Sequence, residues 1–546
     1  MSLKATPIGD IPAETVALAR AIFPKGNVYM LMRDELGTLY TDEDFAELYP
    51  AVGQPAEAPW RLALVTVLQF AEDLTDRQAA DAVRTRIDWK YALGLSLTDR
   101  GFHFSVLNDF RDRLLKGSAE GILLDKMLNV FQERGWLKAG QRQRTDATHV
   151  LAGVRTLSRI EMVGETLRQA LNVLATVLPD WLEEQVGADW YERYGRAFEG
   201  YRMPKAEAEL LALAEQIGRD GWHLLVRLDQ QHAWPWLRQL PALVTLSAVW
   251  EQQYACEADT VRWRPKAELP ECADLICTPY DPQARYSRKR ETTWIGYKVH
   301  LTETCEADAP HLITHVETTP ATQPDCTVVE TIHSDLEQRN RLPGQHIVDT
   351  AYVSSANLVS SQDQHVDLLG PVNLDNSWQA QAAQGFDASQ FQIDWPAHQV
   401  QCPAGQTNDL WLDHQDRHGN PVIQVRFPRQ TCLNCPLRTH CTTSAQGPRI
   451  LTLHPQAQHV ALQQARHRQT TEAFKTTYRV RAGIEGTLSQ AVQVSDLRYT
   501  RYRGLTKTHF QHLATAAALN LTRSIAWLME IPFAKTRTSR FAALAA

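Results

Sequence analysis

The strand-forming stretches of this 546-residue sequence are short and lie far apart, and their spacing constrains the fold more than any other feature. Residues 143–150 alternate as a strand does, and helical periodicity then occupies about residues 155–254. Strand patterns return only later, at residues 294–301, 311–316, 345–349 and 366–372. Strands interleaved with helices predict an α/β protein with a mixed sheet, interrupted after its first strand by a helical insertion.

The chain is too long for one hydrophobic core, because a domain usually holds about 150 residues. We expect an N-terminal helical domain in which Thr75-Asp76-Arg77-Gln78 has the form of a capping box. Two short helices there could be a helix-turn-helix that reads DNA, or only a helical packing unit. The predicted division is an N-terminal helical domain at 1–135, a core at 136–155, 285–372 and 454–532, a helical insertion at 156–284, a cysteine-rich insertion at 373–453, and a tail at 533–546.

Bulk composition narrows the class of protein. A hydrophobic fraction of 44% and a charged fraction of 22% are ordinary for a globular chain, and the net charge of −7 neither favours nor excludes nucleic acid. The segment after Met1 lacks the apolar run of a signal peptide, and the apolar stretch around residues 513–521 is too short to span a bilayer. Nine cysteines, four of them clustered, fit a reducing compartment. We therefore expect a soluble cytoplasmic protein without a membrane segment.

A basic segment near the C-terminus contains one unusual carboxylate. Residues 475–507 hold seven basic side chains and only two acidic ones, Glu485 and Asp496. The i, i+3 and i+7 spacing of Tyr478, Arg481 and Glu485 predicts that all three share one helix face. A carboxylate inside a cationic surface points to a metal ligand where a polyanion docks. A solvated surface group, or an i, i+4 salt bridge from Arg481 to Glu485, would give the same pattern.

Two aspartates lie at strands of the predicted sheet. Asp146 is within the first strand, and Asp349 follows the apolar residues His346-Ile347-Val348. Strand ends carry side chains into the crevice beyond a sheet, although an aspartate there is more often a turn or helix cap than a ligand. Phosphodiester chemistry with two Mg²⁺ ions roughly 3.5–4 Å apart needs two or three such carboxylates.

Several stretches together resemble the DDE-type transposases of bacterial insertion sequences, whose catalytic core is RNase H-like. The resemblance extends from about residue 30 to 530, and the family's basic position seven residues after the glutamate is Val492 here. It rests on Thr145-Asp146-Ala147-Thr148, Val348-Asp349-Thr350-Ala351-Tyr352, Tyr478-x-x-Arg481-x-x-x-Glu485, the strand at 294–300, Arg501-Tyr502-Arg503-Gly504-Leu505, His509-x-x-His512 and Asn520-Leu521.

The resemblance implies an enzyme that cleaves DNA at the ends of an insertion sequence and joins the freed 3′-OH to target DNA. Asp146, Asp349 and Glu485 would hold Mg²⁺ or Mn²⁺, Arg481 would contact a phosphate near the cut, and Tyr478 would stack or hydrogen-bond at the transposon end. Double-stranded DNA and a second copy of the chain, in a synaptic homodimer, are the implied partners. An RNase H-fold endonuclease without strand transfer and a DNA-binding protein derived from a transposase are the alternatives. The other expected DNA contacts are Arg498, Arg501, Arg503 and Lys507.

The clustered cysteines predict a structural zinc site. Cys432 and Cys435 form a C-x₂-C pair, and Cys402 and Cys441 could complete a tetrahedral set of thiolates in a zinc-ribbon-like insertion. His440 could replace Cys441, since adjacent donors cannot be separated by spacing. The alternative is a group of buried thiols in a small reduced domain.

Overall fold

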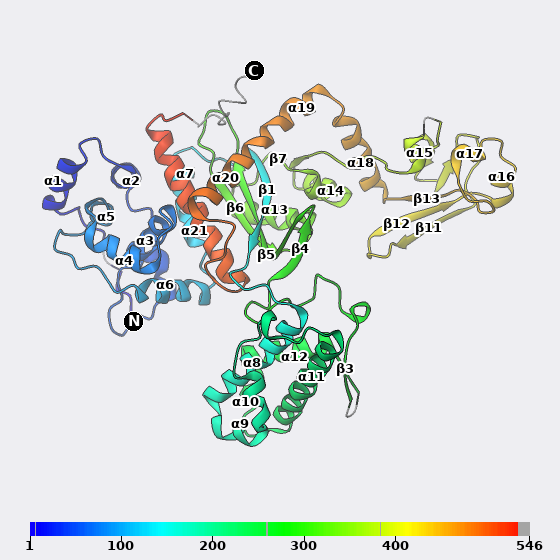
Figure 1. Ribbon diagram of the computed structural model, residues 1–546. Helices are drawn as coiled ribbons and strands as arrows, with labels where there is room; N and C mark the ends of the chain where they lie inside the picture. The colour runs from blue at the N-terminus through cyan, green and yellow to red at the C-terminus, as the bar shows by residue number, and fades with distance from the viewer. Residues whose placement is uncertain (6, 258–259, 383, 533–546) are drawn as a thin grey trace, which may run out of the picture.

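The computed structural model describes residues 1–5, 7–257, 260–382 and 384–532, so the predicted tail at 533–546 lies outside the described residues. A mixed sheet occupies the centre of the molecule, with the N-terminal helices on one side and the cysteine-rich segment on the other (Figure 1). A separate group of helices, α8 to α12, lies beyond one end of the sheet. The predicted mixed α/β class is confirmed.

The central sheet has antiparallel and parallel halves. Strand β5 pairs antiparallel with β1 on one side and with β4 and β6 on the other, whereas β7 joins β1 in parallel and β8 joins β7 in parallel. The five strands expected from the sequence are confirmed, and the short basic strand β4 is additional. The strands are β1 (Arg142–Leu151), β4 (Arg285–Lys289), β5 (Thr292–Thr304), β6 (Ile313–Pro320), β7 (Gln345–Ile347) and β8 (Asp367–Leu369).

The N-terminal part is helical, as expected. The capping box is confirmed: the Gln78 amide N–H donates to the Thr75 hydroxyl at 3.3 Å, and the Thr75 N–H donates to Gln78 Oε1 at 2.9 Å. The helices are α1 (Ala13–Ile22), α2 (Val28–Leu36), α3 (Pro59–Ala71), α4 (Asp76–Thr85), α5 (Ile87–Leu93), α6 (Ser105–Lys116) and α7 (Ile122–Glu133).

One hydrophobic cluster runs from the N-terminal helices through the sheet to the C-terminal helices α20 (Gly483–Ser495) and α21 (Leu505–Leu528). Helix α21 packs against both α3 and β6, and the rings of Phe70 and Phe510 meet edge-on with centroids 6.3 Å apart. The N-terminal helices and the sheet therefore bury a continuous core. Helices α13 (Val329–Gln338), α14 (Ser355–Asp363), α18 (Gln456–Arg468) and α19 (Glu472–Tyr478) complete this part.

The segment between β1 and β4 has a core of its own, centred on Trp250. Five helices and a two-stranded hairpin build it, which agrees with the helical periodicity of the sequence. They are α8 (Arg159–Val177), α9 (Pro179–Gln185), α10 (Ala188–Tyr194), α11 (Glu207–Gln230), α12 (Pro241–Gln253), β2 (Tyr254–Glu257) and β3 (Thr260–Trp263).

The cysteine-rich segment also packs on its own small core, around Val400 and Val425. Gly419 has a φ of 81° in the turn between β11 and β12, a left-handed conformation that suits glycine. The elements are α15 (Trp378–Gln381), β9 (Gln392–Asp394), β10 (Gln399–Gln401), β11 (Leu410–Gln415), β12 (Pro421–Arg426), α16 (Arg429–Leu433), α17 (Arg438–Cys441) and β13 (Ile450–Leu453).

Across the described ranges, none of the helices has both the length and the apolar character that crossing a membrane requires.

Candidate active site

The pairing of β1 with β7 brings the two aspartates to one edge of the sheet. Arg144 lies opposite Ile347 in this parallel ladder. Asp146 comes two residues further along β1, and Asp349 comes two residues after Ile347, just beyond the end of β7. The Asp146 carboxylate accepts the Ala147 N–H at 2.8 Å. Asp349 caps a short 3₁₀ turn, η6 (Thr350–Tyr352), by accepting the Ala351 N–H at 2.9 Å. The sheet thus holds both carboxylates close together, and Asp349 is also a cap.

Arg481 lies among all three predicted carboxylates. Its Nη2 is 2.7 Å from Asp146 Oδ2 and 3.9 Å from Asp349 Oδ2, and its Nη1 is 3.3 Å from Glu485 Oε1. The side chains of Arg481 and Asp146 are only 14% exposed, whereas that of Glu485 is 68% exposed. Three segments that are distant in sequence therefore direct their carboxylates at one cation. The i, i+4 salt bridge considered for Arg481 and Glu485 is present as well.

Burial and the neighbouring charges act in opposite directions on the pKa values of Asp146 and Arg481. Burial raises the pKa of Asp146, while the charge of Arg481 and the Ala147 N–H oppose that rise. Burial also lowers the pKa of Arg481, but the charges of the carboxylates around it, with Asp146 contributing most, outweigh that effect, so this pKa is raised. Within the part of the chain that the structure describes, no hydrogen-bond partner faces the buried Nε of Arg481. The guanidinium therefore keeps one donor unused.

The segment carrying Tyr478, Arg481 and Glu485 is helical but not one α-helix. A 3₁₀ turn, η8 (Arg479–Ala482), separates α19 from α20. The Val480 carbonyl in this turn accepts a hydrogen bond from Arg144 Nη1 at 2.6 Å. Tyr478 ends α19 and stacks on Phe474, with ring planes 12° apart. Arg481 and Glu485 therefore lie within contact of each other, and the 3₁₀ turn that contacts β1 interrupts the regular α-helix expected from the sequence.

The other basic residues predicted to bind DNA mostly contact other residues of this chain. Arg501 pairs with Asp73 and also donates to the Leu74 carbonyl at 2.9 Å. Lys507 lies 3.4 Å from Asp112. These two side chains therefore connect the C-terminal part to the N-terminal helices.

Arg498 and Arg503 lie nearer the sheet and the helical insertion. Arg498 donates to the Thr148 hydroxyl at 3.4 Å, and the Arg503 guanidinium is 5.4 Å from the centre of the Tyr280 ring. Val492 is partly buried and packs against the main hydrophobic core.

A basic run on strand β4 was not predicted as part of the site. The charge of Lys289 acts on Asp146 and lowers its pKa, in the same sense as Arg481. Residues 285–290 contain four basic side chains, and this density was the signal that could have revealed them. The buried Arg144 was also missed, because an arginine in a strand gives no indication of its partner.

The four cysteines of the predicted zinc site lie round one small cavity of about 30 Å³. Burial raises the pKa of the Cys441 thiol, and the sulfurs of Cys432, Cys402 and Cys435 add to that rise although Arg449 opposes it. Cys441 lines the cavity, whereas the ring of His440 packs against Phe386. The fold therefore places the four predicted cysteines round the same cavity.

In the described parts of the chain, no three His, Cys, Asp or Glu side chains have the arrangement of metal ligands. At the sheet edge, the guanidinium of Arg481 lies between the carboxylates. The donor set nevertheless fits a hard divalent cation, since it consists of carboxylate oxygens directed at a shared positive charge.

Two family models match separate parts of the chain. Residues 401–525 match a model described as Transposase DDE domain, and residues 18–113 match one described as Transposase domain (DUF772). Together these two matches support a transposase. More particularly, they support a DDE transposase of the insertion-sequence type, and the resemblance seen in the sequence is confirmed. The first match contains Arg481 and Glu485 but neither aspartate. No curated protein matches the chain.

Proposed function

We propose that this transposase cuts DNA at the ends of its insertion sequence and joins the freed 3′-OH to target DNA. The observation that carries the proposal is the meeting of Asp146, Asp349 and Glu485 at the Arg481 guanidinium, at 2.7, 3.9 and 3.3 Å. A site that gathers three carboxylates round one cation suits divalent ions and a phosphodiester. The mixed sheet would then be the RNase H-like core implied by the resemblance.

Asp146, Asp349 and Glu485 would hold the ions. Bound Mg²⁺ or Mn²⁺ would supply activation of the attacking oxygen and charge stabilisation for the leaving oxygen. In cleavage, water attacks phosphorus, the bond to the 3′ oxygen breaks, and the products are a 3′-OH and a 5′-phosphate. In strand transfer, that 3′-OH attacks a target phosphodiester and releases a target 3′-OH, so one P–O bond replaces another without a covalent enzyme intermediate.

Arg481 would exchange its partners when DNA docks. Its planar guanidinium binds a phosphate in bidentate fashion, and its Nε–H lacks a partner in the described structure. Moving to a DNA phosphate would leave the three carboxylates free for the ions. Tyr478 would contact the transposon end, and Arg498 and Arg503, with the β4 residues Arg288 and Lys289, would contact the backbone.

Arg501 and Lys507 could bind DNA only by giving up Asp73 and Asp112. We propose that DNA binding also involves the N-terminal helices of residues 1–135, and that two copies of the chain hold the two ends. Residues 156–284 and 373–453 would be separate insertions in the core.

We also propose a structural Zn²⁺ held by Cys402, Cys432, Cys435 and Cys441. The support is that all four thiols line one cavity of about 30 Å³ at the end of a small separate core. Zinc would draw the thiolates into tetrahedral geometry and stabilise this segment, with no role in the reaction.

A strand-transfer assay tests the main proposal. Purified full-length protein is incubated with Mg²⁺, a duplex taken from the DNA at one end of the element that contains this reading frame, and a supercoiled target plasmid. We expect cut ends with a free 3′-OH and their covalent joining to the plasmid. Cleavage without joining would support the alternative of an RNase H-fold endonuclease. Binding without cleavage in either Mg²⁺ or Mn²⁺ would indicate a DNA-binding derivative.

A further inference from the structure

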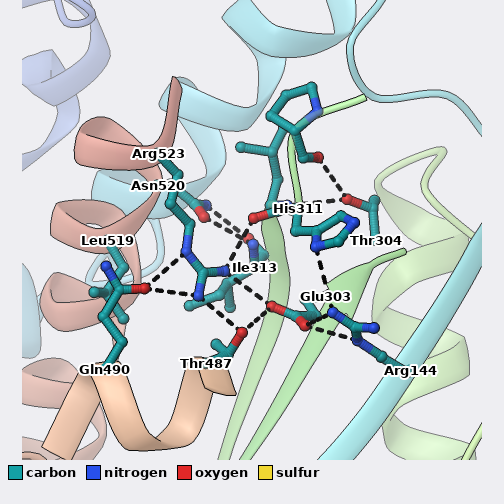
Figure 2. A network of polar contacts seen from close by, with 12 residues as sticks. Arg144, Glu303, Thr304, His311, Ile313, Thr487, Gln490, Leu519, Asn520 and Arg523 are labelled. Atoms are coloured by element: carbon teal, nitrogen blue, oxygen red, sulfur yellow. Dashed lines mark hydrogen bonds and ion pairs between the residues drawn. The ribbon is translucent and has the colours of Figure 1, made fainter. Parts of the chain in front are cut away.

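A buried ionic network begins two residues along β1 from Asp146 (Figure 2). At its centre is Glu303 of β5, whose side chain is fully buried between Arg144 and Arg523. Arg144 Nη2 lies 2.6 Å and Arg523 Nη1 lies 2.9 Å from the Glu303 carboxylate. The Thr487 hydroxyl donates to the same carboxylate at 2.5 Å. Every oxygen of this carboxylate is therefore engaged by a donor.

Stability alone is a poor explanation for such a network. Taking three charges out of water is costly, and well-packed apolar residues usually do as well or better in the same volume. Burial would raise the pKa of Glu303, but Arg523 and Arg144 outweigh it and hold that pKa below its usual range. A carboxylate that stays charged inside the protein requires its partners at fixed positions, so the network specifies geometry.

The network's members belong to the elements that carry the proposed site. Arg144 and Asp146 alternate with Thr145 on β1 and so point to the same face of the sheet. Arg144 Nη1 donates to the carbonyl of Val480, the residue before Arg481.

The other end of the network is fastened to the helix of Glu485. Thr487 lies two residues after Glu485 in α20, and Arg523 of α21 donates to the Thr487 hydroxyl at 2.8 Å and to Gln490 at 2.9 Å. Helix α20 is thereby bound to β1 and β5 through Glu303.

Gly483 gives an independent indication of the same contact. Its φ is −65°, an ordinary helical value, so its backbone has no need for glycine. A Cβ at this position would overlap the Arg144 guanidinium, which Glu303 and the Val480 carbonyl hold in place. Gly486 lies one turn later in the same helix, and a Cβ there would meet nothing within 4 Å. Gly483 therefore makes room for Arg144.

We propose that Arg144, Glu303, Thr487 and Arg523 are positioning residues that set Glu485 and Arg481 against Asp146. This inference rests on the proposed metal-dependent function. It assigns Glu303 a role distinct from that of the three ligand carboxylates, because its side chain is enclosed by protein and directed at two guanidiniums.

Gly483→Ala tests the inference, with Gly486→Ala as its matched control in the full-length protein. Three quantities are measured: the melting temperature, the Mg²⁺ concentration for half-maximal cleavage, and the Mn²⁺ affinity of the complex with a duplex from the end of the element. For Gly483→Ala we expect a metal requirement raised about 10–100-fold at temperatures where the protein is folded, as for residues that orient ligands. Gly486→Ala should keep the wild-type requirement and melt no lower, because alanine favours helix.

Thr487 provides a second pair of variants that does not disturb the backbone. Thr487→Val removes the hydroxyl that binds both Glu303 and Arg523, and it should also raise the metal requirement. Thr487→Ser retains the hydroxyl and should keep the wild-type metal requirement. If Gly483→Ala does not fold, this pair decides the matter.

Two outcomes separate this inference from the proposed function. Variants that melt lower but keep the wild-type metal requirement and Mn²⁺ affinity would show that the network only stabilises the fold, and the inference would be wrong. A wild-type protein that binds Mn²⁺ but never cleaves DNA would contradict the proposed function, and the Mn²⁺ affinities of the variants would still test positioning.

Discussion

Replacing Arg481 with glutamine should make the carboxylate cluster bind divalent ions in the absence of DNA. In the wild-type protein an incoming ion must displace a guanidinium that lies 2.7 Å from Asp146 and 3.3 Å from Glu485. Glutamine is shorter than arginine, keeps a hydrogen-bonding amide and carries no charge. The three carboxylates would then face one another without the Arg481 charge between them.

The size of the effect follows from burial. Breaking a fully buried ion pair costs about 3–5 kcal/mol, and an exposed one contributes about 0–1 kcal/mol. The Arg481–Asp146 pair is 14% exposed on both sides and Glu485 is 68% exposed, so we place the cost of displacing Arg481 near 2 kcal/mol. This corresponds to roughly 30-fold in Mn²⁺ affinity.

The assay is a Mn²⁺ titration followed by the electron paramagnetic resonance of the free ion, with and without a duplex from the end of the element. DNA should tighten Mn²⁺ binding by the wild-type protein, because a phosphate takes Arg481 away, and should have little effect on Arg481→Gln. By reciprocity, Mn²⁺ should tighten DNA binding by the wild-type protein by the same factor. Arg479→Gln, an exposed neighbour in the same 3₁₀ turn, controls for a general change in charge. Equal Mn²⁺ affinities for Arg481→Gln and the wild type, or the same gain in Arg479→Gln, would refute the reasoning.

Three further predictions concern other parts of the chain. Asp349→Asn should retain the cap on Ala351 and the melting temperature but lower cleavage at least about 100-fold; full cleavage would refute the ligand assignment. Elemental analysis of reduced wild-type protein should find one zinc per chain, and Cys432→Ser should lose it. Cys272→Ser should retain the zinc, because Cys272 is exposed and lies far in sequence from the four predicted ligands. Wild-type protein without zinc would contradict this prediction. Burial lowers the pKa of His300 and His512 to about 3 and of His333 and His509 to about 4. The free energy of unfolding should therefore be highest above about pH 6.5 and fall as the pH drops toward 4, by about 1.4 kcal/mol per histidine per pH unit. A melting temperature unchanged between pH 7 and 5 would contradict this prediction.

Local features of the fold could be read from the sequence. The strand at residues 143–150, the capping box at Thr75 and the turn at Gly419 all depend on neighbouring residues, whose spacing and backbone preferences are visible in the chain itself. The same is true of the Arg481–Glu485 contact, which lies within one turn of helix. The residue types of the proposed site were likewise recognisable from short motifs.

What the tertiary structure decided is which distant residues meet. Arg481 and Asp146 are 335 positions apart, and only the pairing of β1 with β7 and the docking of α20 bring Asp146, Asp349 and Glu485 to one cation. The sequence offered Arg501 and Lys507 as DNA contacts, but the fold places them against Asp73 and Asp112. Nothing local distinguishes such ionic partners, because any arginine can pair with any carboxylate until packing selects one. The sequence by itself therefore determined the strands, the helices and the family resemblance, all of which depend on local patterns. Only packing determined that Arg481 lies among three carboxylates.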